Sequence, residues 1–142
     1  MANAIYPKWK EQLLQFTANN NLSAGLVKVA LIDTGAGGYN YSDSHQFYST
    51  VAATSGVIGT PQTIGSKTFT NGVCDGADVT FTSVAGTTSV EALLIYIDTG
   101  TNSTSPLVAW IDTGVTGSPG LPVTTNGGNI SVTWNASGIF AL

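Results

Sequence analysis

The chain has 142 residues, of which 42% are hydrophobic and 8% charged, and four lysines against eight acidic residues give a formal net charge of -4. This length fits one domain that buries enough apolar surface to fold without a disulfide or metal. Because the chain contains no arginine and few lysines, it lacks the positive charge with which proteins hold nucleic acid, and we expect no nucleic-acid partner.

The single cysteine and the first residues bear on the compartment. Cys74 has no second cysteine to pair with, and we expect it to be a small residue of the core or of a strand. The sequence does not begin with the basic and apolar segments of a signal peptide, and no apolar run approaches the roughly 20 residues of a membrane span. We therefore expect a soluble cytoplasmic product with no membrane contact.

The first predicted element is an amphipathic helix. Ile5, Trp9, Leu13 and Phe16 are four, four and three residues apart, which places them on one helical face, and Pro7 suits the first turn. Two interpretations are open. The helix either packs over the end of a sheet or forms an arm that docks on another molecule.

An apolar strand from Val27 to Ile32 follows and stops at Asp33-Thr34-Gly35. The same ending returns at Asp98-Thr99-Gly100 and at Asp112-Thr113-Gly114. An aspartate can bond backbone N–H groups two residues on, and glycine supplies a positive φ, so the triplets are interpreted as turns that end core strands.

The loop after the first triplet is rich in glycine and tyrosine. Tyr39 and Tyr41 are expected to be exposed there, as a contact surface. Asp43 and Gln46 have the spacing of a capping box for one or two helical turns, so His45 is expected on a helix surface or in packing.

The remainder of the chain is predicted to form short strands. Ser89 to Ile97 is apolar enough for a central strand, with the strand ending at Ile111 as its partner, and Asn71-Gly72 indicates a hairpin turn. Gly114 to Pro122 is expected to be irregular. The predicted fold is all-β, an antiparallel β-sandwich of jelly-roll type with one short N-terminal helix. Residues 1–142 form one domain, in which residues 1–24 are a helical N-terminal arm.

An enzymatic alternative rests on the same triplet. Leu31 to Ala36 is similar to the active-site segment of retroviral-type aspartic proteases, which dimerise so that two aspartates activate a water. Such enzymes also need a later apolar-apolar-Gly segment, and the nearest match, Val57-Ile58-Gly59, comes too early. We therefore expect no enzyme, no catalytic residue, no cofactor and no metal site, with a protease using Asp33-Thr34-Gly35 as the alternative.

Taken in order, blocks along nearly the whole chain resemble the head decoration, or cement, proteins of tailed bacteriophages. The order of the blocks carries the resemblance, since none is a specific motif. They are Met1 to Lys8, Val27 to Gly35, His45 to Phe47, Lys67 to Val73, Asp78 to Phe81, Glu91 to Gly100, Ser105 to Leu107, Leu121 to Thr124, Asn126 to Gly128 and Ile139-Phe140.

The resemblance implies a non-enzymatic structural protein on the outer capsid surface of the virion, made in the bacterial host cytoplasm, that stabilises the capsid by bridging neighbouring major capsid subunits. A tail or neck module is the second alternative. We expect self-association, with a homodimer as the default oligomer. Contacts with the capsid or between copies are assigned to large side chains of the N-terminal arm and the tyrosine loop, namely Tyr6, Trp9, Leu13, Tyr39 and Tyr41.

Overall fold

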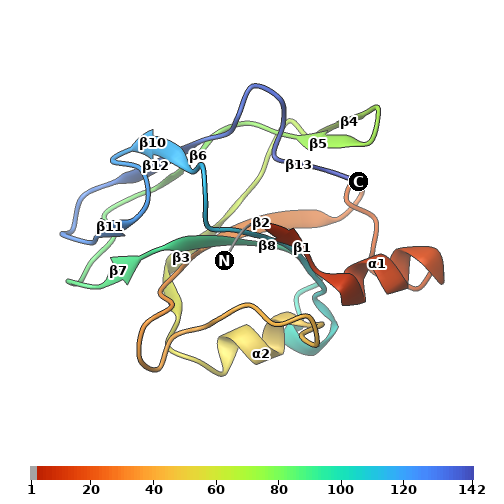
Figure 1. The fold of residues 1–142 in the computed structure, drawn as a ribbon, viewed down its shortest axis with the longest axis horizontal. Coiled ribbons are helices and arrows are strands. Elements are labelled where there is room, and N and C mark those ends of the chain that lie inside the picture. The colour runs from red at the N-terminus through yellow and green to blue at the C-terminus, as the bar shows by residue number, and fades with distance from the viewer. Residues whose placement is uncertain (1–2) are drawn as a thin grey trace.

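The computed structural model describes residues 3–142, which are mostly β-structure in antiparallel sheets (Figure 1). The elements of the first half are β1 (Ala4–Ile5), α1 (Pro7–Leu14), β2 (Leu26–Ile32), α2 (Tyr48–Ala52), β3 (Val57–Thr63), β4 (Thr68–Thr70) and β5 (Val73–Asp75). Those of the second half are β6 (Val79–Phe81), β7 (Ser89–Val90), β8 (Ala92–Asp98), a 3-10 turn η1 (Asn102–Thr104), β9 (Leu107–Ile111), β10 (Thr116–Ser118), β11 (Val123–Thr124), β12 (Ile130–Thr133) and β13 (Phe140–Ala141).

The largest sheet has five strands in the order β1-β9-β8-β2-β3, and every neighbouring pair is antiparallel. The prediction of a central strand between Ser89 and Ile97 is confirmed, because β8 lies in the middle and Ala92 to Ile97 are all buried. β2 and β9 both run opposite to β8, so they end at the same edge of the sheet. Asp33 and Asp112 therefore lie at one edge, and Asp98 lies at the other.

Smaller sheets cover one face of the large sheet, and α2 lies on the other side (Figure 1). Their strand orders are β10-β12-β6, β13-β5-β4 and β11-β7. In β6 and β12 the apolar residues alternate with polar ones, and Val79, Phe81, Ile130 and Val132 join the same buried cluster as β8 and β9. The predicted antiparallel all-β class is thereby confirmed in this β-sandwich-like form. The assignment of residues 1–142 to one domain stays a prediction.

The predicted hairpin turn at Asn71-Gly72 is confirmed. Both residues have a positive φ, 53° and 78°, as a two-residue hairpin turn requires, and the register pairs Thr70 with Val73. Cys74 is buried in β5, as expected of a small core residue, and burial raises the pKa of its thiol to about 11.

The N-terminal helix is confirmed, with Pro7 in its first turn. The prediction that Phe16 shares one helical face with Trp9 is wrong. The helix ends at Leu14, and Phe16 has a φ of 53°, so the helical periodicity no longer governs its direction. Its side chain is 96% exposed.

Two further predictions are corrected. The helical turns expected at Asp43 to Gln46 begin later, at Tyr48. They form a short second helix, α2, in addition to the predicted N-terminal helix. The segment from Gly114 to Pro122 is not wholly irregular, since β10 pairs with β12 there. Gly117 permits this pairing, because a Cβ at that position would collide with the carbonyl oxygen of Ser131.

Candidate functional site

Three of the residues expected to make surface contacts lie in the interior. Tyr6, Trp9 and Tyr39 are each at most 2% exposed, so the expectation that they form a contact surface is corrected. The glycine loop folds back on itself, since the N–H of Tyr39 donates to the carbonyl of Asp33 at 2.9 Å and turns the ring inward. Trp9 packs edge-on against Phe140, with 6.1 Å between ring centroids. These side chains anchor the N-terminal arm to the body of the protein.

The buried phenols continue into a chain of hydrogen bonds that ends at the single histidine. The hydroxyls of Tyr6 and Tyr39 are 2.9 Å apart, and the Tyr39 hydroxyl is 2.9 Å from Nδ1 of His45. Burial raises the pKa of Tyr6 far above its usual value and lowers the pKa of the half-buried His45. His45 is thus a packing residue of the loop, and its neutral form suits this environment.

The other two expected contact residues, Leu13 and Tyr41, are half-buried and line different pockets. Leu13 lies between two hollows beside α1, of about 590 and 530 Å³. Leu14, 88% exposed, and Leu142 line one hollow, and Phe16 lines the other. We call Leu13, Leu14, Phe16 and Leu142 the α1 apolar surface. Of these four residues, only Leu13 was predicted to make contacts.

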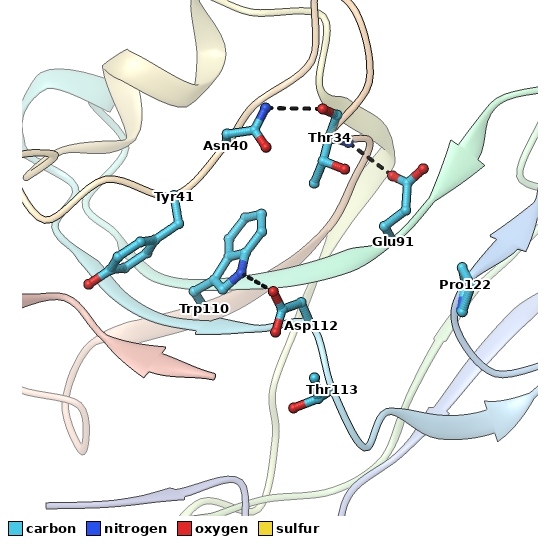
Figure 2. A pocket seen from close by; sticks show the side chains of 8 residues that line it. All are labelled: Thr34, Asn40, Tyr41, Glu91, Trp110, Asp112, Thr113 and Pro122. Carbon is cyan, nitrogen blue, oxygen red and sulfur yellow. Dashed lines mark hydrogen bonds between the residues drawn. The ribbon is translucent and has the colours of Figure 1, made fainter. Parts of the chain in front are cut away.

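A third hollow, of about 380 Å³, opens at the edge of the large sheet where β2 and β9 end (Figure 2). We call it the rim pocket. It combines two aromatic rings and two carboxylates with amide, hydroxyl and proline side chains. The lining residues are Thr34, Asn40, Tyr41, Glu91, Trp110, Asp112, Thr113 and Pro122.

The three Asp-Thr-Gly triplets are turns, and the first two share a hydrogen bond that differs from the one between Trp110 and the third aspartate. Asp33 Oδ1 accepts the N–H of Gly35 at 2.7 Å, and Asp98 Oδ1 accepts that of Gly100 at 2.8 Å, as the turn interpretation predicts. A hydrogen bond from Lys28 and then the one from Gly100 lower the pKa of Asp98. At the third triplet, Asp112 Oδ2 accepts the indole N–H of Trp110 at 3.0 Å.

A positive φ occurs at the glycine of the second and third triplets. Gly100 has a φ of 87° and Gly114 one of 69°, whereas the left-handed residue after the first triplet is Gly37, two positions beyond Gly35. The first and third triplets supply Thr34, Asp112 and Thr113 to the rim pocket. The first and third triplets therefore mark the edge of the sheet where the rim pocket forms, whereas the second lies at the opposite edge.

Within residues 3–142, neither a metal-ligand cluster nor a membrane-spanning helix is present. No three His, Cys, Asp or Glu side chains gather there as potential metal ligands. No helix in that range is long and apolar enough to cross a membrane. No protein-family model matches the chain, and no curated protein matches it.

Proposed function

We propose that the chain is a structural virion protein of a tailed bacteriophage that decorates the outer surface of the head and bridges neighbouring major capsid subunits. It is made in the bacterial host cytoplasm, needs no cofactor and performs no catalysis. The observation that carries the proposal is the α1 apolar surface. Leu14 at the end of α1 and Phe16 just beyond it are almost fully exposed, while Trp9 fixes the helix to the body.

Exposed apolar side chains of this kind favour burial against a partner protein. Burying a leucine or phenylalanine side chain contributes roughly 1.5–3 kcal/mol. Burying both Leu14 and Phe16 would thus contribute about 3–6 kcal/mol, against a loss of association entropy that is estimated at about 4–15 kcal/mol. One contact of this size is weak by itself. It becomes effective when one molecule bridges several subunits or when many copies bind one lattice.

The scaffold suits the same role. We propose that its sheets are arranged as a jelly-roll-type sandwich, which leaves few open edges. Only 8% of the residues are charged, so little ionic surface must be desolvated on assembly. The chain acts as a homo-oligomer, with a dimer as the simplest closed form.

The test uses heads that lack this protein, and it compares substitutions at two exposed phenylalanines, Phe16 and Phe69. We expect the double variant Leu14→Ser/Phe16→Ser to fold, as circular dichroism can check, and to lose co-sedimentation with the heads. The control is Phe69→Ser, because Phe69 is 43% exposed on β4, in another sheet. It should bind as the parent does. Retention of the double variant on the heads would contradict the assignment of this surface.

A further inference from the structure

The rim pocket presents hydrogen-bond acceptors that the protein itself holds in place (Figure 2). Glu91 Oε2 accepts the N–H of Thr34 at 2.9 Å, and Asn40 Nδ2 donates to the carbonyl of Thr34 at 3.0 Å. The second oxygens of both side chains, Glu91 Oε1 and Asn40 Oδ1, have no hydrogen bond within residues 3–142. Because one end of each group is fixed, the acceptor at the other end is oriented before any ligand arrives.

Donors in the lining are mostly engaged already. The groups concerned are the Tyr41 hydroxyl, 2.6 Å from Asp43 Oδ1, Thr113 Oγ1, 3.1 Å from Asn3 Oδ1, and Trp110 Nε1, 3.0 Å from Asp112 Oδ2. Among the lining side chains this leaves the Thr34 hydroxyl and the second N–H of Asn40 Nδ2 as donors without a hydrogen bond within residues 3–142, and no lysine lines the pocket. Glu91 adds to the lining a carboxylate whose Oε1 has no hydrogen bond within residues 3–142. A complementary ligand is therefore a cation with several N–H donors.

We propose that the rim pocket binds the guanidinium group of an arginine side chain from a protein partner. Guanidinium has five donors, no acceptor and a permanent charge, and its plane stacks on aromatic rings. Tyr41 supplies a half-buried ring, and the centroid of the Trp110 ring lies 6.4 Å from the Tyr41 centroid. A volume of about 380 Å³ lies within the range of small-ligand sites. A sugar fits less well, because its hydroxyls need donors as well as acceptors.

The partner is a different protein. This chain contains no arginine, so a second copy of it cannot supply the guanidinium. The inference does not rest on the proposed capsid role, because it concerns a pocket formed by the folded chain alone. It can fail while the capsid role holds, and the capsid role can fail while the pocket still binds arginine.

The direct test is a titration of the purified protein followed by NMR. The probes are N-acetyl-arginine amide, the corresponding lysine compound, the neutral isostere N-acetyl-citrulline amide, and glucose. We expect the arginine compound to shift the Trp110 indole N–H and the Thr34 amide, with the shifts weakened by added salt. Citrulline and glucose should leave both resonances in place, and lysine should bind more weakly than arginine.

Variants locate the binding. Glu91→Gln keeps an acceptor for the Thr34 N–H but removes the charge, and it should weaken arginine binding about tenfold, the effect of losing one charge-assisted hydrogen bond. Glu11→Gln is the matched control, because Glu11 is exposed on α1 and outside the pocket. The proposal is overturned if the arginine compound shifts neither resonance, or if the citrulline compound, the lysine compound or glucose binds as tightly as the arginine compound. It is also overturned if both variants bind the arginine compound equally.

Discussion

Protonation of His45 is predicted to destabilise the protein, because a proton on this ring reverses a buried chain of hydrogen bonds. When the imidazole is neutral with its hydrogen on Nε2, Nδ1 accepts the Tyr39 hydroxyl, whose oxygen accepts the Tyr6 hydroxyl. Every hydroxyl hydrogen then has an acceptor. Once Nδ1 carries a proton, it donates to Tyr39, which donates to Tyr6. The Tyr6 hydrogen then lacks an acceptor along this chain in a fully buried site.

The size and pH range of the effect follow from the structure. An unsatisfied buried donor costs about 1–3 kcal/mol. We expect about 1 kcal/mol, because the half-buried His45 can give up its bond to Tyr39 for water. Its pKa is lowered from 6.5 in the folded state, so the folded protein binds fewer protons than the unfolded chain. The contribution of neutral His45 to the free energy of unfolding is therefore complete above pH 6.5. It is lost as the pH falls below that value towards the pKa of His45 in the folded state.

The assay is urea unfolding at pH 7.5 and pH 5.0, followed by tryptophan fluorescence. We expect the parent to lose about 1 kcal/mol more than Tyr39→Phe over this interval, because the variant cannot link the imidazole to Tyr6. His45→Gln should show the same reduced dependence, since no other histidine is present. An equal loss in the parent and in both variants would refute the reasoning.

Three further predictions follow from named contacts. Trp9→Ala should lower the free energy of unfolding by about 3–5 kcal/mol in urea, whereas Phe16→Ala should stay within about 0.5 kcal/mol, since one side chain is buried and the other exposed. Asp98→Asn should cost up to about 1 kcal/mol at neutral pH, because it removes the 2.8 Å ion pair with Lys28. The pKa of Asp98 is lowered, so this difference should be present above pH 3.8 and shrink in acid titrations below it. Denatured protein incubated at acid pH with the parent or with Asp33→Asn should stay uncut by both, and cleavage lost in the variant would favour the protease alternative.

Local sequence signals predicted the elements that depend on local chemistry. The Asn71-Gly72 turn follows from the two residues that tolerate positive φ, and β8 follows from an apolar run too long to face water. The end of α1 at Leu14 carries no glycine signal, and because the helix stops there, Phe16 leaves the predicted helical face and is exposed.

The candidate sites depend on contacts between distant segments, which explains why most of them were not predicted. Tyr39 turns inward because its backbone N–H donates a hydrogen bond to the carbonyl of Asp33, six residues earlier. Nothing in a glycine-rich loop signals that hydrogen bond. The rim pocket forms because β2 and β9 both run opposite to β8. The repeated Asp-Thr-Gly ending held a usable signal, since alternate strands of an antiparallel sheet end at the same edge. That reasoning would have brought Thr34 and Asp112 together.

Electron microscopy of the virion tests the proposed role most directly. Density with this fold should lie on the outer surface of the head, over joints between neighbouring major capsid subunits, with the α1 apolar surface turned towards the shell. Density for the chain in the tail or neck, or particles that lack the chain altogether, would contradict the account.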